Sequence, residues 1–236
     1  MNPPLVARDL SAGWGNVPVV TELNLTVDSG EIIALMGANG AGKSTTLKAL
    51  SGNLRPLAGT VEWYGTPVRL SLHAMAQRGL RYVPEERSII QRLSTLDNLR
   101  LGPGPVDEAI EFFPEIKPLL KRQAGLLSGG EQQIVTLARA LAGNPKVILA
   151  DELSLGLAPK IVARLFEALK QAASRGVAVV LVEQQVRSAL QLVDRGYVLR
   201  RGKVELEGKA SDLLGRIDEI EETYLAGVVW DETHDQ

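Results

Sequence analysis

Cysteine is absent from this chain of 236 residues, which excludes disulfide bonds and thiolate metal sites and suits a reducing compartment. The net charge of −2 leaves no basic footprint, so no nucleic acid is expected among the partners. The opening residues, MNPPLVARDL, lack the apolar region of a signal peptide. No apolar run approaches the length of a membrane-spanning helix. Any action at a membrane is therefore expected to pass through a partner protein.

The residues that are present have globular proportions, 45% hydrophobic and 23% charged. The length suits one domain, or one core with a small added lobe. Period-two alternation predicts a β-rich stretch at 5–27, and helix-spaced leucines among prolines predict a helical lobe at 88–123. Elsewhere the expected strands are 32–36, 59–64, 80–83, 146–150, 177–183, 196–200 and 203–207, and the expected helices are 45–50, 70–78, 126–142 after an opening turn, 158–174, 186–193 and 212–225. This alternation indicates an α/β fold with a mostly parallel sheet, in which ligands lie beyond the carboxyl ends of the strands.

A phosphate-binding loop is predicted at 37–44, because GANGAGKS matches G-x-x-x-x-G-K-[ST] between a predicted strand and a predicted helix. Its glycines permit backbone angles that turn N–H groups toward an anion at the positive end of a helix. Lys43 can reach the β- and γ-phosphates of a nucleotide, the Ser44 hydroxyl can ligate Mg²⁺, and Thr45 offers a hydroxyl near the α-phosphate. The nucleotide-binding residues predicted in this loop are Gly37, Asn39, Gly40, Ala41, Gly42, Lys43, Ser44 and Thr45.

Two other interpretations of this loop remain less favoured. A glycine-rich turn that binds nothing is disfavoured by the correct flanking elements on both sides. A dinucleotide-binding loop is disfavoured because G-x-G-x-x-G is not present at this position. The phosphates of a nucleotide, with Mg²⁺, are therefore the expected ligands.

Two adjacent carboxylates follow another predicted strand, since VILAD ends in Asp151 and Glu152 comes next. An acidic residue at a strand tip beside a phosphate-binding loop can hold Mg²⁺, and the next carboxylate can polarise the attacking water. Phosphoryl transfer needs such positioning and charge stabilisation more than covalent help. The alternative is a pair of solvated acids at a strand end.

The start of the helix within 126–142 is a second candidate anion site. As a helix N-terminus, Ser128 is the cap and Glu131 is its capping-box partner three residues on. A serine hydroxyl and bare glycine N–H groups at a helix start can also bind a phosphate. Trp14, in the turn SAGWGN, has two interpretations as well: plain packing, or a stacking platform for an adenine ring.

These motifs together resemble those of the ABC transporter ATPases, in order and spacing across nearly the whole chain. The matching stretches are 37–44, LSGGEQQ at 127–133, 147–152 and SLGL at 154–157. The resemblance implies a P-loop NTPase fold of ABC type, with a mostly parallel core, an antiparallel β subdomain and a helical subdomain. It implies one ABC ATPase domain over 1–236, with the helical subdomain inserted at about 88–142. The acidic tail at 227–236 is expected to be flexible from its composition.

The resemblance also implies that two subunits dimerise head to tail, with ATP between the P-loop of one and the Ser128 corner of the other. Ser128, Gly129, Gly130 and Glu131 would then bind the partner's nucleotide, and Trp14 would stack on adenine. The residues implied for hydrolysis are Lys43, Glu152 and Gln184, and those implied for the metal are Ser44, Glu85 and Asp151. ATP closes such a dimer, and hydrolysis reopens it.

Three positions depart from the general pattern of the family. Glu85 stands where a glutamine usually touches Mg²⁺ and senses the membrane subunit, and Gln184 stands where histidine is usual. Gln184 can hydrogen-bond a γ-phosphate but cannot take a proton or carry charge. Leu153 replaces the usual proline after Glu152, with no account of its effect from sequence.

Within the family, the chain most resembles the shorter of the two ATP-binding subunits of branched-chain amino-acid importers. The stretches that carry this resemblance are 82–85, 154–159 and 182–184, and the subgroup shares Glu85 and Gln184. It implies a peripheral protein on the cytoplasmic face of the membrane, with transmembrane permease subunits, a second ATPase in a heterodimer or homodimer, and indirectly a solute-binding protein. The lobe at 88–123 would transmit motion to the permease.

Other functions are weighed against this one. Related importers handle urea, short amides or other amino acids. Soluble ABC ATPases in translation usually carry two ATPase halves, and those in DNA repair carry a long coiled coil, neither of which fits in 236 residues. A P-loop kinase for a small metabolite would leave LSGGEQQ without a role.

Overall fold

The computed structural model describes residues 2–225, with side chains described up to residue 221, so the tail predicted to be flexible at 227–236 lies outside the described residues. The strands are β1 (Leu5–Trp14), β2 (Val17–Val27), β3 (Ile32–Gly37), β4 (Ala58–Trp63), β5 (Thr66–Val68), β6 (Leu80–Val83), β7 (Val147–Asp151), β8 (Ala178–Val182), β9 (Arg195–Arg200) and β10 (Lys203–Lys209). The α-helices are α1 (Lys43–Leu50), α2 (Leu72–Gln77), α3 (Thr95–Arg100), α4 (Val106–Phe112), α5 (Gly129–Leu141), α6 (Pro159–Ser174), α7 (Val186–Leu190), α8 (Ala210–Leu214) and α9 (Ile217–Leu225), and the 3₁₀ helices are η1 (Pro114–Leu119) and η2 (Ala124–Leu126).

The main sheet has the strand order β10-β9-β3-β8-β7-β6. The strands β9, β3, β8, β7 and β6 run parallel, and β10 pairs antiparallel at the edge. Every residue of β3, β7 and β8 is buried, as expected for strands covered on both faces. Alternate residues of β3 enter different cores: Ile33 and Leu35 in one, Ala34 and Met36 in the other. The sheet thus separates two hydrophobic layers.

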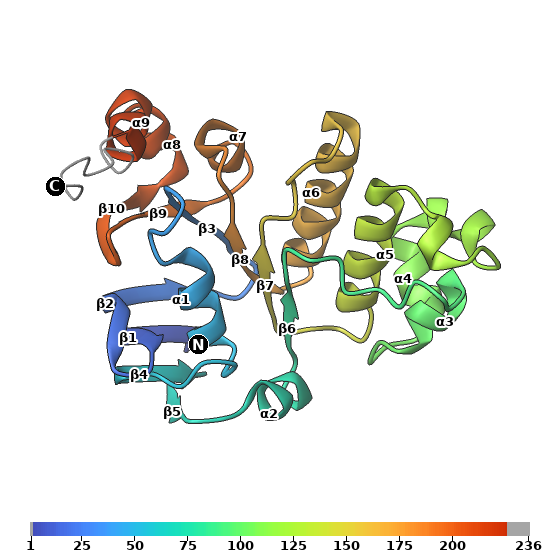
Figure 1. Ribbon diagram of the computed structural model, residues 1–236, viewed down its shortest axis with the longest axis horizontal. Coiled ribbons are helices and arrows are strands. Elements are labelled where there is room, and N and C mark those ends of the chain that lie inside the picture. The colour runs from blue at the N-terminus through green and yellow to red at the C-terminus, as the bar shows by residue number, and fades with distance from the viewer. Residues whose placement is uncertain (1, 226–236) are drawn as a thin grey trace, which may run out of the picture.

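The antiparallel subdomain covers one of these faces. Its strand order is β2-β1-β4-β5, and α1 contacts β1 and β2 as well as β3 and β7 (Figure 1). The helices α5 to α9 pack on the opposite side of the main sheet, where α6 contacts β8 and α7 contacts β3. This arrangement leaves the carboxyl ends of β3, β7 and β8 to carry the loops of the site.

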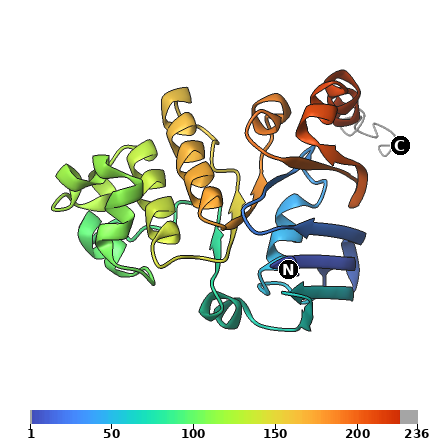
Figure 2. The same cartoon turned by 180° about the vertical axis from the view of Figure 1, so that it is seen from behind.

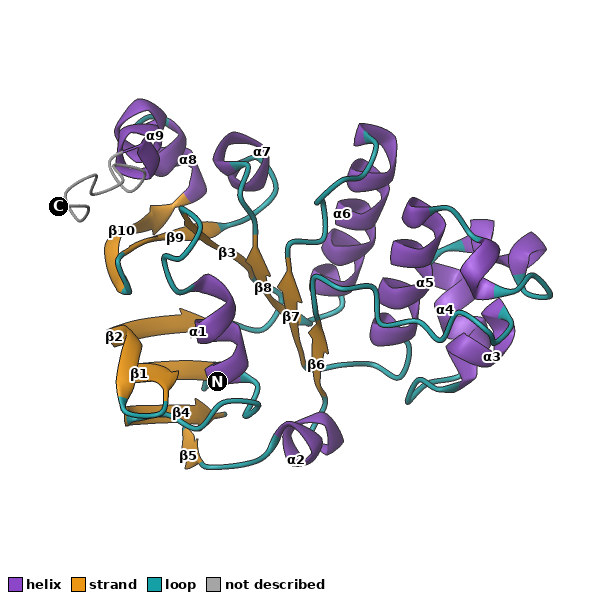
Figure 3. Ribbon diagram, viewed as in Figure 1, coloured by secondary structure: helices purple, strands orange, loops and turns teal. Residues whose placement is uncertain are grey.

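The helical subdomain and the antiparallel sheet lie at opposite ends of the molecule. The chain between β6 and β7 forms α3, α4, η1, η2 and α5, and the view from behind places these helices away from the β1-β2-β4 sheet (Figure 2). Coloured by secondary structure, this end is almost wholly helical (Figure 3). The predicted fold class, a mostly parallel core with an antiparallel β subdomain and a helical subdomain, is confirmed. Within residues 2–225, no helix is both long enough and apolar enough to span a bilayer.

Three elements differ from the sequence prediction. A short strand, β5, was not among the expected elements; within residues 2–225 it pairs with β4 alone, at a sheet edge, where a proline such as Pro67 is tolerated. The helix predicted at 212–225 is two helices, α8 and α9, divided near Gly215, a residue that weakens helices. The helix α7 ends at Leu190, earlier than expected.

Candidate functional site

A polar cleft of about 390 Å³ lies where the loops after β3, β7 and β8 meet. Its lining combines the glycine loop with carboxylate and amide side chains that are far away in sequence: Val19, Asn39, Gly40, Gly42, Lys43, Ser44, Thr45, Glu85, Glu152 and Gln184. Nine of the predicted site residues therefore share one cavity, and Val19 of β2 adds an apolar wall that was not predicted. Parallel strands bring their carboxyl ends to one edge, which explains the convergence.

The glycine loop takes backbone conformations that side chains would oppose. Gly42, at the N-terminus of α1, has φ of 105°, and a Cβ built there would lie 2.6 Å from Val20 Cγ2. Gly37 has φ of 153°, and its Cβ would lie 2.4 Å from the Leu199 carbonyl oxygen. The loop is thus held close to β2 and β9, with its N–H groups at the start of a helix, where an anion is favoured.

Lys43 is almost fully buried at the bottom of this loop, with 5% of its surface exposed. Its ammonium donates to the carbonyl oxygens of Gly37 at 2.8 Å and Ala38 at 3.1 Å. Burial lowers the pKa of Lys43, and the negative charges of Glu152 and Asp151 oppose that effect. The chain therefore holds a cation inside a loop of backbone N–H groups, which suits a polyphosphate.

Asp151 and Ser44 meet across the main sheet, although 107 positions separate them. The Ser44 hydroxyl donates to Asp151 Oδ1 at 3.2 Å, and the Tyr82 hydroxyl donates to Asp151 Oδ2 at 3.3 Å. Burial raises the pKa of Asp151, while these two hydrogen bonds lower it. Tyr82 lies on the neighbouring strand β6, and burial followed by the Asp151 charge raises the pKa of its hydroxyl. The Ser44 and Tyr82 hydroxyls therefore fix the orientation of both carboxylate oxygens of Asp151.

The oxygen-rich set around Asp151 fits Mg²⁺ in composition, since this ion prefers oxygen ligands and keeps waters and phosphate oxygens in its shell. Among the described residues, no three His, Cys, Asp or Glu side chains converge closely enough to hold a metal ion. The protein would thus supply Ser44 and Asp151 to an ion held jointly with a nucleotide. Partial burial, then the charges of Glu152, Asp151 and Glu86, raises the pKa of Glu85 on the cleft wall. A cation here would relieve this repulsion.

Glu152 and Gln184 form a direct pair in the cleft, where Gln184 Nε2 donates to Glu152 Oε2 at 2.6 Å. The backbone of Glu152 has φ of 48°, a left-handed conformation that is unfavourable for a residue with a side chain. Its N–H donates to the Val182 carbonyl oxygen at 3.0 Å. The sheet edge thus holds Glu152 in a strained conformation that aims its carboxylate at Gln184.

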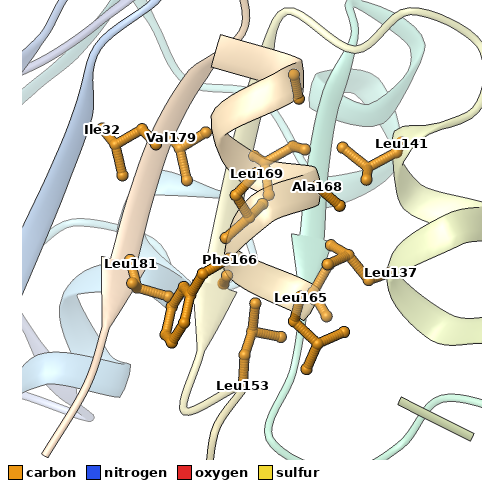
Figure 4. Packing of buried hydrophobic residues seen from close by; sticks show 14 of the residues in the cluster. Ile32, Leu137, Leu141, Leu153, Leu165, Phe166, Ala168, Leu169, Val179 and Leu181 are labelled. Atoms are coloured by element: carbon orange, nitrogen blue, oxygen red, sulfur yellow. The ribbon is translucent and has the colours of Figure 1, made fainter. Parts of the chain in front are cut away.

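Leu153 is buried, with 1% of its surface exposed, and belongs to the core beneath α6. Figure 4 shows its side chain beside Leu165 and Phe166, near the start of that helix. Leucine in place of proline therefore adds an apolar anchor that fixes the chain directly after Glu152. This is the physical account of Leu153 that the sequence did not provide.

Glu183 follows β8 directly and is 3% exposed. Its carboxylate accepts from the Ser154 N–H at 3.2 Å and from the Ser154 hydroxyl at 2.5 Å. Burial raises the pKa of Glu183 to about 7, and the charges of Glu152 and Asp151 act in the same direction, while both Ser154 hydrogen bonds oppose it. A neutral form of this carboxyl is therefore accessible near neutral pH.

The raised pKa of Glu183 predicts a pH-dependent stability. Folding raises this pKa from 4.5 to about 7, so the folded chain binds the proton more tightly than the unfolded chain. The contribution of Glu183 to stability is then greatest below about pH 4.5 and is lost as the pH rises through about 7, a change of about 3 kcal/mol. Replacing Glu183 with glutamine is expected to raise Tm at pH 8 by several degrees and to have less effect toward pH 5. Thermal unfolding of both proteins across this range measures the difference; an equal gain at both pH values would contradict the burial cost.

The remaining predicted residues lie outside the cleft. Trp14 ends β1, is 58% exposed, and stands with its ring centroid 5.6 Å from Lys48 Nζ of α1. Ser128 caps α5 by accepting from the Glu131 N–H at 3.3 Å, and Glu131 Oε2 accepts from the Ser128 N–H at 2.7 Å. The capping box is thus formed. It gives Ser128 a structural role as a helix cap, whether or not the helix start also binds an anion. Gly129 and Gly130 form the first turn of α5.

Sequence reasoning missed Tyr82 and Glu183 as parts of the site, and it noted Leu153 only as a departure from the family pattern. Tyr82 lies within β6 and Glu183 directly follows β8, and neither residue belongs to a motif for phosphate or metal binding. A charged residue directly after an apolar strand and next to Gln184 was the available signal for Glu183. Their contacts with Asp151 and Ser154 join residues 69 and 29 positions apart.

The glycine loop after β3, the carboxylates at the end of β7 and directly after it, and the amide after β8 define a nucleotide-hydrolysing P-loop protein. The model of the ABC transporter family matches residues 20–154, more than half of the chain, and this protein belongs to that family. It is an ATPase subunit that couples ATP hydrolysis to transport.

Two curated relatives match nearly the full length of the chain. The high-affinity branched-chain amino acid transport ATP-binding protein BraG of Pseudomonas aeruginosa is 37% identical, covering 92% of this chain and 97% of that protein. The lipopolysaccharide export system ATP-binding protein LptB of Haemophilus influenzae is 35% identical, covering 94% and 96%. Among solved structures, a dimeric post-hydrolysis state of an ATP-binding cassette bound to ADP and Pi is 26% identical, with a TM-score of 0.77 and coverage of 87% and 98%. The family model and these relatives thus agree on an ABC-type ATPase fold.

Proposed function

We propose that this chain powers the import of branched-chain amino acids by closing and reopening an ATPase dimer beneath a membrane permease. The observation that carries the choice of solute is the 37% identity to BraG over almost the entire length of both chains. The cleft is proposed to be the ATP-hydrolysing site, since the glycine loop, Asp151 at the end of β7 and the Glu152–Gln184 pair come together there.

The proposed binding mode places the ATP phosphates in the loop at 37–44. Loop N–H groups and Lys43 face the β- and γ-phosphates, and Thr45 lies near the α-phosphate. The two carbonyl contacts of the Lys43 ammonium would be exchanged for phosphate oxygens, which are stronger partners because they are charged. Asn39 and Gly40 line the cleft, whereas Ala41 is buried behind it with 5% of its surface exposed.

Ser44 Oγ and Asp151 would hold Mg²⁺, with Glu85 at its outer side. When bound, the ion would neutralise charge that develops on the phosphates. Tyr82 keeps Asp151 in place by occupying its second oxygen. Glu85 also begins the connection to the helical subdomain, so it is placed to link the cleft with that subdomain.

Glu152 is proposed to polarise the water that attacks the γ-phosphate. Its strained backbone and its 2.6 Å bond from Gln184 fix the direction of the carboxylate. Gln184 can donate its amide to a γ-phosphate oxygen or to Glu152, which makes it a sensor of the phosphate rather than a proton acceptor. Hydrolysis would release this contact and loosen the closed state.

The Ser128 corner is proposed to bind ATP held by a second subunit. None of Ser128, Gly129, Gly130 and Glu131 lines the cleft with Lys43, which supports the proposal that the two corners of one chain serve different nucleotides. Trp14 is 58% exposed beside α1 and would stack on the adenine of the nucleotide in its own P-loop. The expected partner is a second, unlike ATPase, with a homodimer as the alternative.

The helical subdomain is proposed to contact the permease on the cytoplasmic face of the membrane. Large apolar side chains on it are half exposed, including Ile90 at 49% and Leu101 at 56%. Such side chains suit a protein partner. A solute-binding protein would act through the permease and would not touch this chain.

A second candidate function is an ATPase for lipopolysaccharide export, which the 35% identity to LptB over 94% of the chain favours. In import of urea, short amides or other amino acids, the same ATP-hydrolysing site would act with a different permease. These alternatives differ in cargo and share every proposed role of the site residues.

The test of the proposed cargo is uptake of labelled leucine, isoleucine and valine by cells that lack this chain. Urea and short amides serve as parallel substrates, and complementation with the wild type or with Glu152→Gln serves as the control. We expect loss of leucine-type uptake, restored by the wild type alone. Loss of urea or amide uptake instead would change the cargo. Normal uptake of all substrates, together with a defect in surface lipopolysaccharide, would favour the export function.

A further inference from the structure

Glu183 is a buried carboxyl, and no side chain in the described part of the chain forms an ion pair with it. The neighbouring charges that act on it are the carboxylates of Glu152 and Asp151, and its hydrogen bonds come from Ser154 alone among the described residues. Burying a carboxyl against like charges is costly, and a valine or leucine would fill the end of an apolar strand more cheaply. A costly group at this place calls for a reason other than core packing.

The contacts of Glu183 complete a ladder between two chain segments at the edge of the main sheet. Asp151 lies opposite Val182 in the parallel pairing of β7 with β8. Beyond that pair, the Glu152 N–H donates to Val182 O, and the Gln184 amide donates to Glu152. The two Glu183 contacts to Ser154 extend the ladder by one further rung. Residues 182–184 and 152–154 are thus joined by four hydrogen bonds.

Ser154 connects this ladder to the surface. Leu153 is buried under α6, whereas Leu155 is 50% exposed, so the chain leaves the core at Ser154. Glu183 grips the backbone N–H and the hydroxyl of the residue at this exit. A movement of the surface loop at 154–157 would therefore reach the Glu152–Gln184 pair through Glu183.

We propose that Glu183 is a positioning residue for ATP hydrolysis, which locks Ser154 to the segment carrying Gln184 and so holds Gln184 and Glu152 in register. The proposal rests on the proposed roles of Glu152 and Gln184. Glu183 itself does not line the cleft that receives ATP. Its loss should therefore slow the chemical step and leave nucleotide binding intact.

The decisive comparison is Glu183→Ala against Glu183→Gln in the purified full-length chain, under conditions in which the wild type hydrolyses MgATP. Glu183→Ala removes both bonds to Ser154 and is expected to lower kcat about ten- to a hundredfold with little change in KM. Glu183→Gln can accept from the Ser154 N–H and donate to its hydroxyl oxygen, so kcat is expected within about threefold of the wild type. Rescue by glutamine assigns the role to the hydrogen bonds and not to the charge.

Two further variants keep the test valid if Glu183→Ala folds poorly. Ser154→Ala leaves the backbone bond and removes the hydroxyl, so a smaller loss of kcat is expected, and combining it with Glu183→Ala should add little. Glu62→Ala is the matched control, because Glu62 is a buried glutamate in the antiparallel sheet, paired with Arg8 at 2.6 Å. It is expected to lower Tm without lowering kcat.

Several outcomes would overturn the proposal. Wild-type kcat in both Glu183→Ala and Ser154→Ala would remove any positioning role. A glutamine variant as slow as the alanine variant, at equal Tm, would assign the effect to charge. A rise in KM that accounts for the whole loss would place Glu183 in nucleotide binding. Failure of the proposed roles themselves is separate, since Glu152→Gln would then hydrolyse ATP normally in the same assay.

Discussion

Replacing Glu152 with glutamine is expected to lower ATP hydrolysis about 10²- to 10⁴-fold while ATP still binds. The substitution keeps the shape of the side chain and removes the carboxylate that would polarise the attacking water. Gln184 could still pair with the new amide oxygen, so the 2.6 Å contact need not be lost. Lys43 and the glycine loop remain unchanged, which is why binding should survive. The expected variant therefore binds ATP but hydrolyses it very slowly.

Single-turnover hydrolysis and equilibrium binding of ATP measure the two parts of this prediction separately. Glu86→Gln is the matched control, because Glu86 is an exposed carboxylate near the cleft that does not line it. It should hydrolyse ATP at the ordinary rate. If Glu152→Gln turns over like the control, another group polarises the water.

A closed dimer trapped by ATP is the second consequence of Glu152→Gln. If ATP holds two subunits together and hydrolysis parts them, the slow variant should accumulate as a dimer with ATP and as a monomer without it. Size-exclusion chromatography with each nucleotide tests this. The trapped complex can also be isolated from membranes and its subunits identified. An unlike ATPase in the complex would indicate a heterodimer, and a second copy of this chain would indicate a homodimer. A variant that stays monomeric with ATP bound would oppose the head-to-tail arrangement.

The loop at 37–44 was predictable because its functional residues are consecutive in the sequence. Glycines for positive φ, a lysine and a serine lie within one continuous strand-loop-helix unit, in which β3 ends at Gly37 and α1 starts at Lys43. The parallel sheet was predictable too, since buried apolar strands alternate with amphipathic helices. Parallel strands then bring the residues after β7 and β8 to the same edge as the loop.

The supporting contacts were not predictable, because they depend on the registers of strands distant in sequence. Tyr82 reaches Asp151 only because β6 pairs with β7 so that Tyr82 lies opposite Leu149. Glu183 reaches Ser154 only because β7 and β8 end level with each other. Leu153 was noticed as a departure, and its packing under α6 required the fold. Strong motifs thus locate a site, while its fixing contacts come from the tertiary structure.

The Ser128 corner poses a different problem, because one sequence feature has two complete explanations. The capping box between Ser128 and Glu131 is formed, and a helix N-terminus needs no ligand to justify it. Its separation from the cleft that holds Lys43 is what allows a second nucleotide to be considered. The two roles of Ser128, helix cap and contact with a partner's nucleotide, can be distinguished by a substitution that blocks the Ser128 corner and leaves the cleft unchanged.

Replacing Ser128 with arginine is expected to abolish turnover that depends on a dimer, while ATP binding by the isolated chain stays nearly unchanged. The long side chain would fill the corner where the partner's γ-phosphate is proposed to lie, so the two subunits could not close on ATP. The loss of the serine cap should cost about 1 kcal/mol of stability, which is too little to unfold the chain. Nucleotide affinity of the isolated chain and hydrolysis by the assembled transporter are the two measurements.

Ser71→Arg is the control that separates capping from contact. Ser71 is the exposed N-cap of α2, where its hydroxyl accepts from the Ala74 N–H at 3.4 Å, and no site residue lies on that helix. It should lose a similar amount of stability and keep its turnover. Equal turnover in Ser71→Arg and Ser128→Arg would reduce the Ser128 corner to a helix cap. Loss of ATP binding by the isolated Ser128→Arg chain would mean that the corner acts on the nucleotide of its own P-loop, and the two-subunit arrangement would have to be abandoned.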